Sequence, residues 1–288
     1  MREFLDRHYI IKALLALIIY LAINFSFKLI CELVGVNFDS NTDYFIREIL
    51  SKVLPAVGIM LLFKATYSTK QFSAKSFFKC FISGLVFLVI SAGELIGLLI
   101  YMNTEGKSFK GIPDIIVYII FVLAIGLSEE LFFRGVLPDI IRGNEIGSED
   151  VSKKRAILAA VVSSLLFGFV HIVNIFVGQG VYDTIGQMIY ASCVGFIFYA
   201  VYNKHKNLYG LIVLHAIVDF AGLARGGLIK GASIAMQPED SGAGAVLGAS
   251  ILGVVFLLVA LFIYLPKRKI LRKIFKREKH ADGQACAQ

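Results

Sequence analysis

Two adjacent carboxylates and an arginine lie inside a stretch of apolar residues. Glu129, Glu130 and Arg134 fall within residues 121–138, whose other members are typical of a membrane-spanning helix. A charge near the bilayer centre costs about 2.5–3.5 kcal/mol even on the lenient insertion scale. The pattern therefore predicts that these three side chains face the interior of a helix bundle, where their charge is used for chemistry.

Three further ionisable residues occur in two other apolar stretches. His171 follows Phe167 by four residues. Asp219 follows His215 by the same interval. Residues four apart share one face of a helix. Counting ~1.5 Å per residue from the expected cytoplasmic ends places Glu129 and His215 at a similar depth of ~10–14 Å. We therefore expect the polar faces of three helices to border one cavity.

The composition indicates whether these helices lie in water or in lipid. Hydrophobic residues make up 57% of the chain, charged residues only 17%, and the mean hydropathy is +0.76. These values lie far outside the average of soluble domains. The sequence therefore predicts an all-α, polytopic membrane helix bundle with an interior polar cavity. Apolar runs of about 20 residues give eight expected spans: 10–30, 45–63, 78–101, 115–137, 159–177, 185–202, 209–224 and 246–265.

The order of these spans divides the chain into four parts. Residues 1–114 hold the first three helices, and residues 115–224 hold helices four to seven with all the motifs above. A loop and the eighth helix occupy 225–265, and a basic tail occupies 266–288. The distribution of Lys and Arg between the loops predicts a multi-pass protein of the cell membrane with both termini in the cytoplasm.

The basic tail accounts for most of the net charge of +8. Eight Lys and Arg residues against two acidic residues give the tail a local charge of +6. Apolar residues recur through it at helical spacing, so it either lies on anionic lipids as an amphipathic helix or remains a solvated segment that fixes topology. The small remaining charge indicates no nucleic-acid partner. The four cysteines have no spacing that indicates a disulfide framework or a zinc cluster.

The motifs resemble those of a known family when they are taken together and in order. Glu129-Glu130-x-x-x-Arg134, Phe167-x-x-x-His171 and His215-x-x-x-Asp219 on three helices resemble the CPBP family of CAAX proteases and bacteriocin-processing enzymes. The resemblance covers about residues 115–224. It implies an intramembrane endopeptidase that acts on membrane-associated or lipidated proteins and peptides.

The resemblance also implies a role for each motif residue. Glu129 and His171 would activate water, since a carboxylate and an imidazole that share one water supply a general base. His215 and the residue four positions later would stabilise the oxyanion, which a dry cavity favours. We expect Glu130 and Arg134 to form a supporting ion pair, because adjacent buried carboxyls need a compensating cation.

The eukaryotic form of the pattern resembles His-x-x-x-Asn. In this chain Asp219 replaces that asparagine. An amide can donate to an oxyanion, whereas an ionised carboxylate can only accept. Asp219 must therefore be protonated, orient His215 through a ring N–H, or bind a metal, and we prefer the orienting role. Glu129, His171, His215 and Asp219 could also hold zinc or manganese, although we favour a reaction that needs no cofactor. Phe167 is expected to pack beside His171.

Two other functions remain as alternatives. Intramembrane acids and histidines also form the proton relays of ion-coupled transporters. That class of protein predicts repeated halves with broken helices, and we find no such symmetry. The second alternative is a catalytically silent scaffold or immunity protein on the same fold, because a fold does not determine function. Glu94, within the third expected span, is a polar helix contact or part of a cavity wall.

Overall fold

The computed structural model describes residues 8–34, 41–62, 73–142, 153–232 and 241–264. The basic tail, and with it the expected lipid-binding surface, lies outside the described residues. The described chain is mostly helical, and its only strand-like pairing is the isolated bridge between Phe109 and Ile229. Its elements are α2 (Tyr9–Leu33), α3 (Asn41–Leu62), α4 (Ala74–Ser83), α5 (Leu85–Thr104), α6 (Ile112–Glu130), η2 (Leu131–Val136), α7 (Leu137–Arg142), α8 (Lys153–Phe169), η3 (Val170–Val177), α9 (Val181–His205), α10 (Leu208–Gly222), α11 (Ala224–Leu228) and α12 (Ala243–Tyr264).

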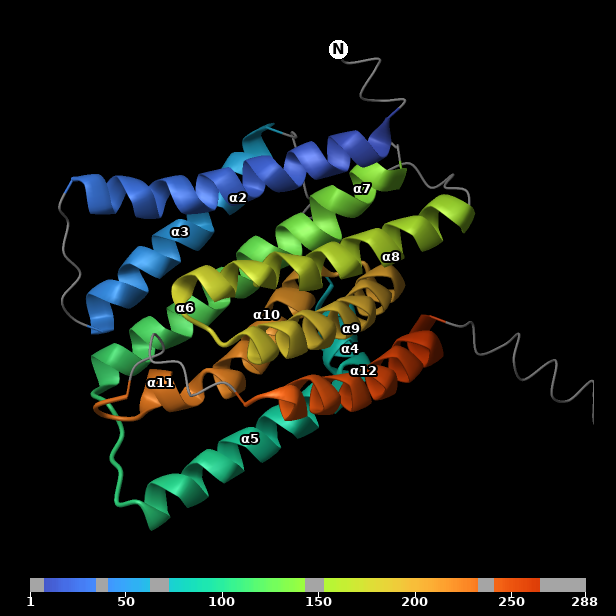
Figure 1. The fold of residues 1–288 in the computed structure, drawn as a ribbon. Helices are drawn as coiled ribbons and strands as arrows, with labels where there is room; N and C mark the ends of the chain where they lie inside the picture. Colours follow the sequence, from blue (N-terminus) through green and yellow to red (C-terminus); the bar gives the residue numbers. More distant parts are fainter. Residues whose placement is uncertain (1–7, 35–40, 63–72, 143–152, 233–240, 265–288) are drawn as a thin grey trace, which may run out of the picture.

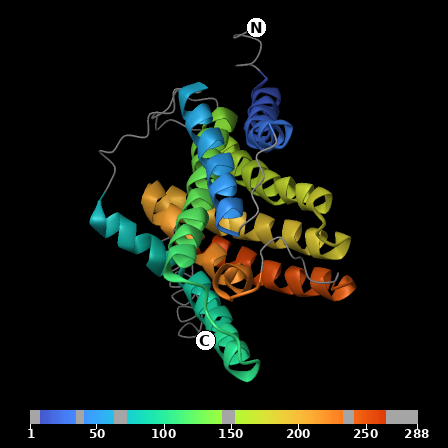
Figure 2. The ribbon, with the colours of Figure 1, turned by 90° about the vertical axis from the view of Figure 1, so that its left-hand side faces the viewer.

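The short helix α10 lies at the centre of the bundle. It packs against α4, α5, α6 and α9. On one side α8, α9 and α12 lie side by side (Figure 1). On the other side α3 packs against α2 and α6, and Figure 2 shows α3 running alongside α6. A helix surrounded in this way can carry polar side chains without exposing them to lipid.

Six helices are long and apolar enough to cross a membrane, two fewer than the eight spans expected from sequence. They are Tyr9–Cys31, Leu85–Thr104, Ile112–Arg142, Lys154–Phe176, Val181–His205 and Ala243–Ile263. The described chain is thus a polytopic all-α bundle of the expected class, and the protein is an integral membrane protein. The differences concern three of the expected spans.

Each difference has a physical reason. The expected second span is the helix α3, but it carries four charged residues and is too polar to qualify. The expected seventh span is α10, whose 15 residues rise only ~22 Å against a hydrocarbon core of ~30 Å. The expected third span is divided at Gly84 into α4 and α5. A side chain at Gly84 would collide with Leu214 of α10, so glycine is required where these helices meet.

The C-terminal end of α10 is covered by an aromatic residue of α6. The hydroxyl of Tyr118 donates to the carbonyl oxygen of Phe220 at 2.7 Å. Tyr118 is fully buried in an apolar cluster with Phe45, Phe121 and Leu228. Backbone that ends inside a membrane protein needs such partners, because lipid supplies none.

Candidate active site

The acidic pair lies where one long helix changes its winding. The α-helix α6 ends at Glu130, and a buried π-helical turn, η2, continues it from Leu131 to Val136 before α7 begins. Turns of this kind occur often at functional sites. Glu130 and Arg134 remain neighbours across this junction, with 3.2 Å between Arg134 Nη1 and Glu130 Oε1. The structure thus brings together the pair that the sequence spacing indicated.

Gly126 sets the distance between α6 and α10. A Cβ atom at Gly126 would lie 2.7 Å from the carbonyl oxygen of Ile212 and 3.4 Å from the backbone nitrogen of Ala216. Only glycine therefore permits this approach. The contact places the end of α6, with Glu129 and Glu130, beside His215.

His215 is the most heavily contacted ionisable group of the site. Its side chain is buried, and its Nδ1 atom lies 2.6 Å from Glu130 Oε1. Its Nε2 atom lies 3.7 Å from Glu129 Oε2 and 3.5 Å from Asp219 Oδ2. Because an ionised carboxylate only accepts hydrogen bonds, Nδ1 carries the proton that is donated to Glu130. Glu130 therefore holds the ring in place, and this contact was not expected from sequence.

Arg134 and Phe167 enclose the other side of His215. The guanidinium of Arg134 lies 4.2 Å from the centroid of the Phe167 ring and 5.3 Å from that of Phe198. These faces stabilise a cation that has left water. Phe167 also meets the rings of His171 and His215 edge-on, at centroid distances of 5.5 and 5.9 Å. Phe167 thus contacts both histidines and the arginine.

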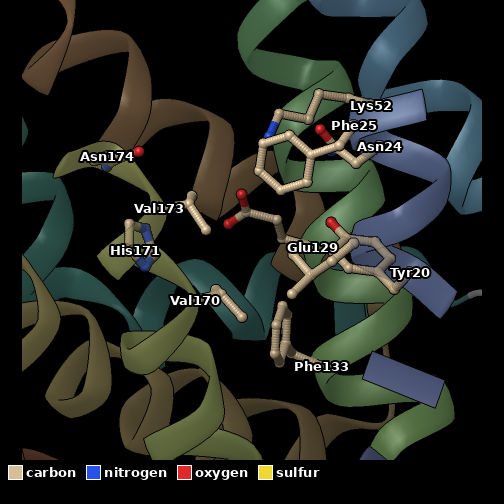
Figure 3. A pocket seen from close by; sticks show the side chains of 11 residues that line it. Tyr20, Asn24, Phe25, Lys52, Glu129, Phe133, Val170, His171, Val173 and Asn174 are labelled. Atoms are coloured by element: carbon tan, nitrogen blue, oxygen red, sulfur yellow. The ribbon is translucent and has the colours of Figure 1, made fainter. Parts of the chain in front are cut away.

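His171 lies in the 3₁₀ turn η3 that follows α8. Its Nδ1 atom is 2.9 Å from the backbone oxygen of Phe167. A carbonyl oxygen can only accept, so Nδ1 is the protonated nitrogen and Nε2 keeps its lone pair in the neutral ring. Among the described residues His171 forms no ion pair with Glu129. The two side chains instead line the same cavity (Figure 3).

This cavity has a volume of about 80 Å³. That is room for a few water molecules, each of which takes up roughly 30 Å³ in the liquid. Its wall is formed by residues from helices that are distant in sequence. These residues are Tyr20, Leu21, Asn24, Phe25, Lys52, Glu129, Phe133, Val170, His171, Val173 and Asn174. The expected interior polar cavity is therefore present, but His215 and Asp219 adjoin it through Glu129 rather than forming its wall.

Sequence reasoning missed the contribution of α2 and α3 to this cavity. Tyr20 and Asn24 come from α2, and Lys52 comes from α3. The signal was present, because Lys52 stands inside an expected membrane span, where a cation indicates a function. Tyr20 shares a hydrogen bond of 3.0 Å with Ser128, next to Glu129 in the chain. The first helices therefore help to position the acidic pair.

Within the described part of the chain, no group of three or more His, Cys, Asp or Glu side chains is arranged to hold a metal ion. The Nδ1 atoms of both histidines are engaged by Glu130 and by the Phe167 carbonyl, and the His215 Nε2 atom faces two carboxylates. The arrangement provides instead a carboxylate and an imidazole lone pair on one small polar cavity.

Comparison with known proteins finds one family similarity. Residues 111–221 match the family model described as "Type II CAAX prenyl endopeptidase Rce1-like". No curated protein and no solved structure gave a significant match to the chain. The matched region begins just before α6 and ends within α10, so it contains every motif residue of the site. Through this region the chain is similar to the CPBP/CAAX family of intramembrane proteases.

Proposed function

We propose that the protein hydrolyses peptide bonds of lipidated or membrane-associated substrates, with a water molecule activated between Glu129 and His171. The observation that carries this proposal is that both side chains line one cavity of water-holding size, with the Nε2 lone pair of His171 unprotonated. A general base must reach the proton it removes directly or through one water. A carboxylate and an imidazole on one cavity meet that requirement.

The reaction needs no group beyond these side chains and water. Water loses one proton to Glu129 or His171, and its oxygen forms a bond to the scissile carbonyl carbon. When the C–N bond breaks, the same proton passes to the leaving nitrogen, so the products are a carboxylic acid and an amine. The base thus returns to its initial state after each turnover. We propose that neither zinc nor manganese takes part.

His215 is the proposed oxyanion partner. In its doubly protonated form the ring donates Nδ1–H to Glu130 and presents Nε2–H to the carbonyl oxygen that gains charge. The carboxylates of Glu129, Glu130 and Asp219 supply the negative charge that balances this form. Glu130 orients the ring, and Arg134 compensates the buried charge of Glu130. In this proposal Asp219 is a polar neighbour of the His215 Nε2 atom.

Cleavage of a prenylated peptide by the purified protein tests the proposal. A farnesylated CaaX peptide with a fluorophore and a quencher on opposite sides of the expected bond reports hydrolysis directly. We expect cleavage by the parent and its loss in Glu129→Gln, with folding preserved. Glu94→Gln is the matched control, because it removes another carboxyl from an apolar helix but lies outside the cavity. Full activity of a folded Glu129→Gln protein would contradict the assignment.

A further inference from the structure

The 3₁₀ turn η3 carries a second polar residue to the wall of the cavity. Asn174 follows His171 by three residues, and both lie within Val170–Val177. Side chains three positions apart in a 3₁₀ helix lie in line with one another, and a run as long as this one is uncommon. Figure 3 shows His171 and Asn174 on the same side of the cavity, facing Glu129. The proposed mechanism uses His171 and leaves Asn174 without a role.

Hydrogen bonds fix the position of Asn174 and the direction of its amide. Its Nδ2 atom donates to Oε1 of Gln187 on α9 at 2.8 Å. Its backbone oxygen accepts from the N–H of Gln179 at 3.0 Å, so the main chain is held as well. Because Nδ2 is turned to α9, the amide oxygen Oδ1 is directed into the cavity (Figure 3). Within the described part of the chain, no hydrogen bond engages Oδ1.

The reaction brings a suitable donor to this oxygen. An amide oxygen only accepts hydrogen bonds, so Asn174 Oδ1 needs an N–H or O–H group as its partner. The carbon that water attacks comes within about 3 Å of the water, and the nitrogen of the same peptide bond is only about 1.3 Å from that carbon. The scissile N–H therefore comes to the cavity that Asn174 lines. A cavity of this size has to admit only the scissile bond for the contact to form.

We propose that Oδ1 of Asn174 accepts a hydrogen bond from the N–H of the scissile peptide bond. This inference rests on the proposed function and adds a residue to the same site. Attack on the carbonyl carbon ends amide resonance, and the leaving nitrogen then has to turn its lone pair to the base that returns the proton. A fixed acceptor for its N–H sets that orientation.

The contact has a consequence for the kind of bond that is cleaved. An ester has an oxygen where a peptide bond has its N–H, and two oxygen acceptors cannot form a hydrogen bond with each other. Asn174 therefore favours cleavage of amides over esters. Gln187 is a positioning residue in this scheme, because it directs the amide of Asn174 and touches no reacting atom.

Two substrates that differ at one atom test the proposal. One is the farnesylated CaaX peptide with a fluorophore and a quencher, and the other is its depsipeptide, in which an ester oxygen replaces the scissile N–H. The kcat/KM of each is measured, with spontaneous ester hydrolysis subtracted by means of the Glu129→Gln form. We expect Asn174→Leu to lower cleavage of the amide about tenfold to a hundredfold and to change cleavage of the ester less than about threefold.

Further variants separate this contact from general damage, because damage to water activation affects both substrates equally. Asn174→Asp keeps an acceptor oxygen, so the ratio of amide to ester cleavage should stay close to that of the parent. Gln187→Leu frees the amide of Asn174 to turn and should lower the ratio about threefold to tenfold, whereas Gln187→Glu keeps the acceptor and should preserve it. Asn24→Leu is the matched control, because it removes another amide from the wall of the same cavity and should leave the ratio unchanged.

Two results would overturn the inference while the proposed function stands. One is an amide-to-ester ratio that Asn174→Leu leaves unchanged, which would give Asn174 a structural role only. The other is an equal fall of the ratio in Asn24→Leu and Asn174→Leu, which would assign the effect to the shape of the cavity. Absence of cleavage of both substrates by the parent is a different result, because it contradicts the proposed function and this inference with it.

Discussion

His215 and His171 each have a motif partner four residues away, yet their surroundings differ. His215 is 4% exposed, and carboxylates lie within 4 Å of both its ring nitrogens. His171 lies in the wall of the cavity, fixed through Nδ1 by a backbone carbonyl, with Nε2 open. The first environment is a closed network that holds charges in place, and the second is open to water. Equivalent spacing in sequence can therefore serve two purposes, and variants of each environment should fail in different ways.

The closed network should give the largest effect. Arg134→Met removes the cation beside Glu130 and leaves an uncompensated buried carboxylate, so we expect the free energy of unfolding to fall by about 3–5 kcal/mol and activity to be lost with it. Thermal unfolding in detergent measures the loss. The double variant Glu130→Gln/Arg134→Met removes both charges and should recover part of the stability. If Arg134→Met were as stable as the parent, the surroundings of His215 and of His171 would not differ as described.

The open side should lose activity without losing stability. His171→Gln removes the imidazole lone pair, and we expect cleavage to fall by about 10²–10⁴-fold, the usual contribution of a general base. Its thermal unfolding should match that of the parent closely, because the described contacts of the ring are one hydrogen bond and the edge of Phe167. Comparable destabilisation of His171→Gln and Arg134→Met would contradict the distinction between the closed network around His215 and the open environment of His171.

The packing of α6 against α10, which connects the two environments, can be disturbed at Gly126. A methyl group there meets the Ile212 carbonyl at 2.7 Å, so Gly126→Ala must push α6 away from α10. We expect a cost of about 1–3 kcal/mol, as for other overpacked sites, and a loss of activity from the displaced Glu129 and Glu130. Gly93→Ala in α5 is the control, because a methyl group there meets nothing within 4 Å. An active, fully stable Gly126→Ala protein would show that this contact does not position the site.

Asp219 should give the smallest effect of the four. Its Oδ2 atom is buried 3.5 Å from His215 Nε2 and has no hydrogen bond among the described residues. An amide of the same shape can still accept from the ring or donate to an oxyanion, so Asp219→Asn should retain activity within about tenfold. Metal analysis of active protein should show no stoichiometric zinc or manganese. Metal that is present in the parent and lost with activity in Asp219→Asn would assign Asp219 as a ligand.

Local spacing predicted the parts of the site that lie within one helix. The interval between Glu130 and Arg134 indicated an ion pair, and the two groups lie 3.2 Å apart. The similarity to the family and the polytopic helical fold also followed from sequence, since three ordered motifs and the composition carry that information. The contact between Glu130 and His215 did not, because it depends on how closely α6 approaches α10 at Gly126. Such an approach is a property of packing and has no periodic pattern.

The contribution of α2 and α3 was missed for a different reason. The motifs all lie after residue 111, so no part of the site was expected in the first helices. Hydropathy assigned residues 45–63 to a membrane span and gave no role to the lysine within it. In the structure that residue, Lys52 of α3, lines the cavity. A charged residue inside an expected span was therefore the available signal.

The aromatic cover at the end of α10 has a consequence for the membrane as an electrical barrier. A hydrolase that admits water into a bilayer could let protons pass and dissipate the ion gradient. Tyr118 lies eleven positions before Glu129 on α6, or ~16 Å along the helix. There it holds the Phe220 carbonyl within the apolar cluster that includes Phe45 and Leu228. Tyr118 and this apolar cluster therefore lie between Glu129 and the N-terminal end of α6, where buried aromatic side chains would oppose the passage of water and protons.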